Sequence, residues 1–320
     1  MKKVLKFSCL PLILVLLVFV SCKDDDPLPA DNDFVTLSEY LVNNNMDLPD
    51  LLSGWIVGAP ALEDEPDFVT DNYIIDIRQS ADYDAAHITN AVNSSLANIL
   101  TAAEGANGKP IVVVCYTGQS AGHAVMALRL SGYDNAKVLK FGMSGWNSSL
   151  SGPWNSNTGD AAIGHSNWNF DATQAATTFG APTWTATSTN GAGILAERVQ
   201  VMLSEGFKGI SNADVLAVPG NYFINNFWAQ ADTDKYGHFE GAYRLFPMTH
   251  TNDDFMNLDP NKTVVTYCWT GQTSSMVTAY LTVLGYDAKS LKFGVNGMIY
   301  SNLEGHKFVM PSVDLPVVNE

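Results

Sequence analysis

Cysteine is scarce in this chain, and so is positive charge. The 320 residues include four cysteines, with no Cys-x-x-Cys pair, and neither Cys115 nor Cys268 has a partner at metal-ligand spacing. These absences exclude a dithiol oxidoreductase motif and a structural zinc site, so we expect no metal and no cofactor. Basic residues number 17 against 33 acidic ones, a formal net charge of −16. Nucleic acid is therefore not an expected partner.

Hydrophobic runs are short as well. The apolar stretch at residues 10–20 is too short to span a bilayer as a stable helix, and three lysines precede it. This pattern predicts a signal peptide at residues 1–21. The stretch ends in Ser21-Cys22, which resembles a bacterial lipobox and predicts lipidation of Cys22. The alternative is a plain secretory signal that happens to contain a cysteine.

Residues 22–33 are rich in aspartate and proline and have no periodicity, which predicts an acidic tether. The expected location is the bacterial cell envelope. There a lipid anchor would hold the protein to the outer membrane, on its periplasmic or its surface face. Cys9 would leave with the signal and Cys22 would carry the lipid, so Cys115 and Cys268 remain as thiols.

A six-residue segment occurs twice, at residues 115–120 and 268–273, and the two copies lie about one domain length apart. Each copy follows a buried β-branched run and precedes a helical pattern that ends at a glycine, Gly132 or Gly285. Strand, loop, helix and strand in this order predict a βαβ unit with a parallel sheet. The predicted strands are 72–77, 111–114 and 138–141 and then 222–224, 263–267 and 290–293; the predicted helices are 120–130 and 273–284.

The repeat predicts two α/β domains, each a central parallel β-sheet with helices on both faces. Domain 1 is expected at residues 34–150 and domain 2 at 195–312, with a C-terminal tail at 313–320. Between them, residues 151–194 are rich in Ser, Thr, Asn and Gly and are expected to form a linker. Its tryptophans, Trp154, Trp168 and Trp184, are expected to pin it to the domain surfaces, the alternative being a ligand platform.

A cysteine between the carboxyl end of a parallel strand and a helix N-terminus is surrounded by backbone N–H groups, which favour its thiolate. Gly118 and Gly271 would let each loop curl so that its amides converge on an anion. Cys115 and Cys268 are therefore the candidate nucleophiles. The candidate substrate-binding loops are Tyr116, Thr117, Gly118, Gln119 and Ser120 in the first copy and Trp269, Thr270, Gly271, Gln272 and Thr273 in the second.

The whole pattern resembles a tandem rhodanese-domain protein. The resemblance rests on the two cysteine loops, on Asp76-Ile77-Arg78, on the segment that begins at His87, and on the Gly-rich segment that ends at Trp146. It implies a sulfurtransferase that moves sulfane sulfur from a thiosulfate or polysulfide donor to a thiol or cyanide acceptor through a cysteine persulfide. Asp76, Arg78 and His87 would support the site, and Cys115 ranks before Cys268.

The departures from the family pattern leave an alternative open. Both loops are uncharged, and the second copy has Asn225-Asn226-Phe227 where the first has Asp76-Ile77-Arg78. A non-catalytic rhodanese-like binding or redox-sensing surface lipoprotein fits these departures. A Cys-dependent phosphatase does not, because Ala121 and Ser274 occupy the place of its arginine. His123 is expected to face solvent, and the sequence names no protein partner.

Overall fold

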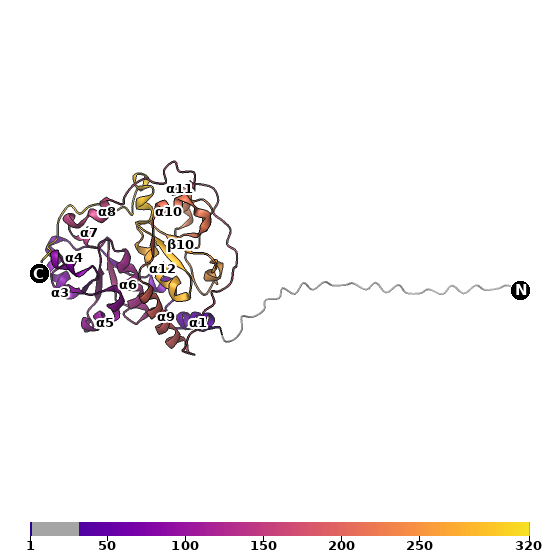
Figure 1. Ribbon diagram of the computed structural model, residues 1–320, viewed down its shortest axis with the longest axis horizontal. Coiled ribbons are helices and arrows are strands. Elements are labelled where there is room, and N and C mark those ends of the chain that lie inside the picture. The colour runs from indigo at the N-terminus through magenta and orange to yellow at the C-terminus, as the bar shows by residue number, and fades with distance from the viewer. Residues whose placement is uncertain (2–31, 320) are drawn as a thin grey trace.

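The computed structural model describes Met1 and residues 32–319. The predicted lipidation site Cys22, almost all of the tether and nearly the whole predicted signal peptide lie outside the described residues. Among the residues that are described, no helix has the length and apolar character needed to cross a membrane. The chain forms two α/β halves that lie side by side, the first coloured indigo to magenta and the second orange to yellow (Figure 1).

The first half is built on a five-stranded sheet in which all neighbouring strands are parallel, with the order β1-β5-β4-β2-β3. The central strands coincide with the β-branched runs of the sequence. The strands are β1 (Ile56–Val57), β2 (Tyr73–Asp76), β3 (Val92–Asn93), β4 (Ile111–Val114) and β5 (Lys137–Leu139). The helices are α1 (Asp33–Asn43), α2 (Leu48–Leu51), α3 (Glu65–Asp71), α4 (Ser80–Ala85), α5 (Ile99–Ala103), α6 (Gln119–Leu130), α7 (Met143–Trp146) and α8 (Gly152–Asn155).

The second half repeats this plan with a four-stranded parallel sheet of order β7-β11-β10-β8. Its strands are β7 (Gly209–Ile210), β8 (Phe223–Asn226), β10 (Val264–Tyr267) and β11 (Ala288–Leu291). Its helices are α9 (Gly191–Glu205), α10 (Asn212–Ala217), α11 (Gln230–Tyr236) and α12 (Gln272–Leu284). The predicted pair of parallel α/β domains is confirmed.

The two sheets share one hydrophobic core. Along β4, Val113 points to this core, whereas Val112 and Val114 point to a separate core on the outer face. In the second half, Val264 belongs to the shared core and Val265 to an outer one. Because side chains alternate along a strand, each sheet is apolar on both faces and needs helices on both.

Helices α6, α9 and α12 form the layer between the sheets. In Figure 1, α6 and α12 lie near the centre of the molecule, and α9 lies below them with α1 beside it. α6 and α12 pack directly on each other, and most of their side chains are buried. Their N-termini carry the two cysteine loops, so this packing sets the position of one loop relative to the other.

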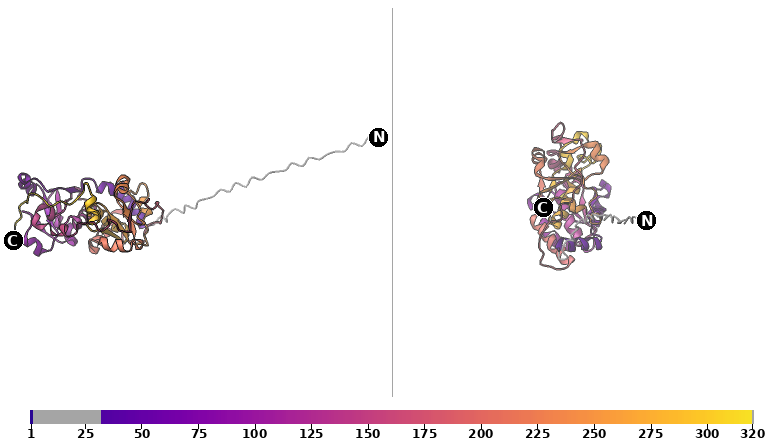
Figure 2. Two further views of the ribbon diagram at one scale, coloured as in Figure 1. Left: turned by 90° about the horizontal axis from the view of Figure 1, so that it is seen from above. Right: turned by 90° about the vertical axis from the view of Figure 1, so that its right-hand side faces the viewer.

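Each end of the described chain packs on the half that is more distant in sequence. α1 contacts α9, and the Phe34 ring meets the His250 ring edge-on at 6.4 Å. At the other end, Val318 pairs with His87 in an antiparallel bridge, and the Trp146 indole N–H donates to the Pro316 carbonyl at 2.8 Å. The C-terminus accordingly lies beside the first half (Figure 2). These contacts stabilise the two halves as one folded unit.

The last predicted strand of each half is shorter or shifted. β5 ends at Leu139 and β11 at Leu291, because the following Phe141 and Phe293 have φ values of 64° and 62°. Each residue begins a tight turn that returns the chain to the cysteine loop. A left-handed φ is unfavourable for a phenylalanine, and the apolar pattern gave no sign of it.

Two of the linker tryptophans, Trp154 and Trp168, are buried, and Trp184 is partly buried against the shared core. Trp154 lies edge-on to both Phe141 and Phe293, at 5.3 and 5.1 Å between ring centroids. Trp168 packs on the second half through a small antiparallel sheet of β6 (Trp168–Asn169) and β9 (His238–Phe239). The Trp184 indole donates to the Leu284 carbonyl at 2.9 Å. Protein groups cover the rings of Trp154 and Trp168, so the ligand-platform alternative is wrong for these two.

The expectation that His123 faces solvent is wrong. His123 is 1% exposed, and its Nε2 lies 3.3 Å from the Met202 carbonyl of α9. Burial lowers the pKa of His123 to about 4. The helical pattern could not show this, since α9 comes from the other half of the chain.

We predict that His123→Gln reduces the sensitivity of the fold to acid. The unfolded histidine takes up a proton near its usual pKa of 6.5 and the folded one only near 4, so stability falls as the pH drops through that range. The shift corresponds to about 3 kcal/mol. Urea unfolding at about pH 7 and about pH 4.5 should show a smaller loss for the variant than for the wild type. Equal losses would contradict this account.

Candidate active site

Cys115 lies at the carboxyl end of the central strand β4, directly before α6. Gly118 caps α6 with a φ of 79°, and the same role falls to Gly271 before α12, with a φ of 77°. A left-handed residue at this point turns the chain from the strand into the helix, and only glycine adopts it without strain. The sequence repeat therefore produces the same strand-end loop twice.

A turn in the Gly-rich segment fastens each loop. In the first half, the Met143 amide donates to the Cys115 carbonyl at 2.8 Å, and Ser144 donates to Tyr116 at 3.1 Å. Gly142, with a φ of 61°, lies so close that an added Cβ would overlap the Cys115 carbonyl oxygen. Main-chain hydrogen bonds thus hold the start of the loop before any side chain contributes.

The same fastening recurs in the second half. The Val295 amide donates to the Cys268 carbonyl at 3.2 Å, and Asn296 donates to Trp269 at 3.2 Å. Gly294 stands where Gly142 stands in the first half, again too close to the cysteine carbonyl for a Cβ. The two loops have matching backbones.

The two sulfur atoms have different neighbours. Cys115 Sγ accepts a hydrogen bond from the Gly118 amide at 3.1 Å, within its own loop. Cys268 Sγ instead accepts from the Ser274 amide at 3.3 Å and lies 3.5 Å from the Ser274 hydroxyl. That hydroxyl lies 2.8 Å from the hydroxyl of Ser290 on β11. Sequence reasoning missed this hydroxyl pair, although the change from Ala121 to Ser274 between the copies was a signal.

Both cysteines are free and buried, with exposures of 4% for Cys115 and 2% for Cys268. A reagent must be small, or a loop must open, for either sulfur to react. The partly exposed residues of the predicted loops are Tyr116, Thr117 and Ser120 in the first copy and Trp269 and Thr273 in the second. Thr270 is buried. The Thr117 hydroxyl accepts from the Gln119 side chain at 3.1 Å.

Arg78 and Asp76 form a buried ion pair beneath the first loop, with Nη2 and Oδ2 2.6 Å apart. The guanidinium lies over the Tyr116 ring at 4.9 Å. Burial acts to lower the pKa of Arg78, but the hydrogen bonds and charge of Asp76 outweigh it, so the pKa is raised. The charged pair holds Tyr116, and through it the loop.

The second copy keeps this arrangement without the charges. β8 pairs with β10 so that Asn226, not Asn225, occupies the place of Asp76, which corrects the sequence alignment by one residue. Trp228 then replaces Arg78, and it stacks on Trp269 at 4.5 Å as Arg78 stacks on Tyr116. His306 covers the other side of Trp269 at 4.7 Å.

His87, predicted to support the site, contacts α4 and the C-terminal segment. Its ring stacks on Tyr83 at 3.8 Å, and its Nδ1 lies 2.9 Å from the Tyr83 carbonyl. Its backbone pairs with Val318 of the tail. His87 thus ties α4 and the C-terminal segment together.

Gln119 and Gln272 lie where the two loops meet. Gln119 Oε1 accepts from the Phe293 amide at 2.8 Å, in the turn that fastens the other loop. Gln272 Nε2 lies against Gly118 so closely that a Cβ there would overlap it. Each glutamine therefore reaches out of its own loop and into the opposite half.

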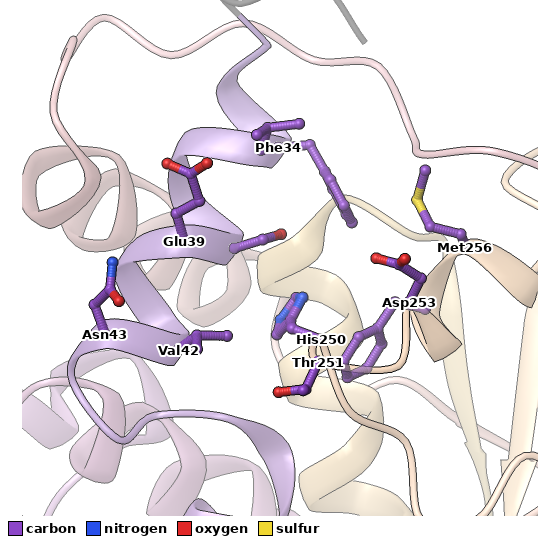
Figure 3. A pocket seen from close by; sticks show the side chains of 11 residues that line it. Phe34, Glu39, Val42, Asn43, His250, Thr251, Asp253 and Met256 are labelled. Atoms are coloured by element: carbon purple, nitrogen blue, oxygen red, sulfur yellow. The ribbon is translucent and has the colours of Figure 1, made fainter. Parts of the chain in front are cut away.

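A cavity of about 390 Å³ lies elsewhere, between α1 and residues 250–256 (Figure 3). Phe34 and His250 point into it from opposite sides. His250 Nε2 lies 3.0 Å from the hydroxyl of Tyr280, eight residues along α12 from Gln272 and thus about 12 Å away along the helix axis. Burial lowers the pKa of His250 to about 4. The cavity is separate from the cysteine loops.

The fold and the loops define a two-domain α/β protein with a strand-end cysteine in each domain. The chain matches the family model of the rhodanese-like domain at residues 61–149 and again at 223–299, just over half of its length. It belongs to the rhodanese-like domain family and holds two copies of the domain. No match was found among curated proteins.

Several solved structures resemble the chain at low identity. The thiosulfate sulfurtransferase of Pseudomonas aeruginosa is 16% identical with a TM-score of 0.29, over 82% of this chain and 46% of that one, so this chain spans under half of that protein. The 3-mercaptopyruvate sulfotransferase SseA of Escherichia coli is 18% identical, over 76% and 98%, with a TM-score of 0.29. The 3-mercaptopyruvate sulfurtransferase of Leishmania major is 14% identical, over 79% and 76%, with a TM-score of 0.29. Family membership rests on the sequence match.

We predict that Gly142→Ala disturbs the Cys115 loop, whereas Gly132→Ala does not. Both glycines have positive φ, so both variants carry a backbone penalty, about 1 kcal/mol at Gly132 and more at Gly142, whose ψ of −149° places it in a region open essentially to glycine alone. Only at Gly142 does the added Cβ meet the loop backbone; at Gly132 it meets nothing within 4 Å. The rate of Cys115 alkylation, followed by peptide mass spectrometry, should change for Gly142→Ala alone. Equal rates in the two variants would contradict a fastening role for this turn.

Proposed function

We propose that the chain is a rhodanese-type sulfurtransferase in which Cys115 carries sulfane sulfur as a persulfide and Cys268 is a second site. One observation carries the proposal above the others. In a family-matched segment, a free cysteine ends a parallel strand, and its sulfur accepts a hydrogen bond from the loop amide of Gly118 at 3.1 Å. The same N–H group is placed to stabilise a persulfide anion on that sulfur.

The reaction balances in two steps. The Cys115 thiolate attacks the outer sulfur of the donor, a new S–S bond forms, and the S–S bond of the donor breaks with its electron pair leaving on sulfite or on a shortened polysulfide. A thiolate or cyanide then attacks the outer sulfur of the persulfide and releases the Cys115 thiolate. No metal or other cofactor takes part in either step.

Charge and burial favour a polysulfide over thiosulfate as donor. The chain carries a net charge of −16, and neither loop contains a cation of its own. A dianion gains no attraction there, and it would have to enter a site in which the sulfur is 4% exposed. A polysulfide is an anion as well, but its charge is spread along a slender chain of polarisable sulfur atoms, so it loses less hydration on the same path than the compact thiosulfate.

Cys115 ranks ahead of Cys268 because of the neighbours of each sulfur. The Cys115 sulfur is directed to its own loop amide. The Cys268 sulfur is directed at the first turn of α12, where Ser274 engages it, and the Trp269 ring of its loop is stacked between two others. The second thiol is therefore held in a more crowded setting.

A second candidate function is supported by the burial of both thiols. A non-catalytic binding or redox-sensing protein would keep the fold and the cysteines while denying access to a donor. Cysteines with only a structural role and cysteines in closed active sites can both be as little exposed as Cys115 at 4% and Cys268 at 2%. Sulfur loading separates the two functions.

We also propose that Cys22 anchors the protein by lipid in the bacterial cell envelope, at the outer membrane. The support is the sequence alone: an apolar stretch behind three lysines, with Ser21-Cys22 at its end. The acidic tether at residues 22–33 would then separate the folded domains from the membrane. The proposal covers both faces of the outer membrane, the periplasmic face and the cell-surface face.

We predict that the mature protein gains about one sulfur mass per reactive cysteine when it is treated with polysulfide. Intact-protein mass spectrometry should show the gain in the wild type and in Cys268→Ser, and a much smaller gain in Cys115→Ser. Cyanide should reverse it, since cyanide removes sulfane sulfur from a persulfide. If neither cysteine gains sulfur while both are still alkylated by iodoacetamide, the non-catalytic function replaces this one.

We predict that Cys22→Ser releases the protein from membranes. In a bacterial host that processes lipoproteins, the wild type should sediment with membranes and carry a diacylglyceryl mass at its N-terminus, and the variant should remain in the soluble fraction. Cys9→Ser is the matched control and should behave as the wild type. A wild type that is soluble and carries no lipid would refute the anchor.

A further inference from the structure

Each cysteine loop extends a glutamine side chain across the contact between α6 and α12 to the opposite loop. Gln119 follows Gly118 in the first loop, and Gln272 follows Gly271 in the second. Their side chains are 3% and 1% exposed, so both amides are enclosed by protein. In each case the enclosing surface includes the glycine of the opposite loop.

On one side the exchange is a complete hydrogen bond. Gln119 Oε1 accepts from the Phe293 amide at 2.8 Å, and an added Cβ on Gly271 would lie 2.6 Å from the same oxygen. Phe293 begins the turn whose next amides hold the Cys268 loop. The Ser275 hydroxyl donates to the Gln119 carbonyl and fixes the base of this side chain.

The side-chain amide of Gln272, in contrast, is a hydrogen-bond donor without an acceptor among the described residues. Gln272 Nε2 lies against Gly118 and has no hydrogen-bond partner among the described residues. Gly118 is the residue whose amide donates to Cys115 Sγ. A buried amide N–H without a partner costs free energy, and an anion in the Cys115 loop would supply one.

We propose that each glutamine is a positioning residue for the cysteine of the opposite domain: Gln272 for Cys115 and Gln119 for Cys268. The chain therefore needs both domains to build either site. Sulfur bound at one loop also moves the glutamine that positions the cysteine of the other loop. This follows because the glutamine and the amides of a loop belong to the same turn of backbone.

In the simplest interpretation of the sequence, each glutamine would instead position the cysteine four residues before it. The two interpretations predict opposite results for the same variants. Alkylation by iodoacetamide distinguishes them and needs no sulfur donor, so it can fail independently of the sulfurtransfer that the proposal deepens. Peptide mass spectrometry reads the rate at each cysteine separately across a range of pH.

The decisive variants are Gln272→Met and Gln119→Met, which keep the length of the side chain and remove its amide. Gln272→Met should change the alkylation rate of Cys115 by about two- to tenfold and leave that of Cys268 nearly constant. Gln119→Met should change the rate of Cys268 more than that of Cys115, whose loop loses only the hydrogen bond from Gln119 to the Thr117 hydroxyl. Gln200→Met, on the exposed face of α9, is the control and should change neither. Thermal unfolding shows whether each variant is folded.

Gln272→Glu and Gln119→Glu are the second pair, nearly identical in shape to the wild type. A carboxylate beside the opposite loop should move the pH profile of alkylation of the opposite cysteine to higher pH, more than that of the cysteine in the same loop. A purely structural role would not produce this crossed shift. Effects confined to the cysteine of the same loop, equal effects on both cysteines, or no effect on either would each overturn the proposal.

Discussion

The contact between α6 and α12 is the constraint on which the rest of the structure depends. The helices approach closely at Gly122, where an added Cβ would lie 3.0 Å from the Gln272 carbonyl oxygen. Both helices begin at a cysteine loop, so the packing that buries the shared core also sets the two loops against each other. The fastening turns complete the arrangement, with Phe141 and Phe293 meeting around Trp154. A change in the interface is therefore a change in both sites.

Within this common frame the two copies have diverged in chemistry. The first loop rests on a buried ion pair, through Arg78 and Tyr116, and directs its sulfur to a loop amide. The second rests on stacked rings and directs its sulfur to Ser274. The backbone of the loop is thus conserved between the halves while the surroundings of the thiol differ. Such a pair allows one site to be reactive and the other to be closed within one fold.

Much of the fold could be predicted from the sequence because it follows from local patterns. The run at 111–114 became β4, Gly285 ended α12 as a left-handed cap, and the repeat gave the second domain. The cysteine loops were found by the same route. What could not be predicted depends on contacts between distant segments: the burial of His123 against α9 and the crossed glutamines. No pattern within either repeat carries that information.

The Cys115 loop is built to hold an anionic outer sulfur, and a crystal structure of polysulfide-treated protein would reveal that sulfur in place. We expect additional density bonded to Cys115 Sγ, with the new sulfur within hydrogen-bond distance of the loop amides and the protein otherwise unchanged. Unmodified Cys115 in protein whose thiols remain alkylatable, or sulfur found only on Cys268, would contradict it.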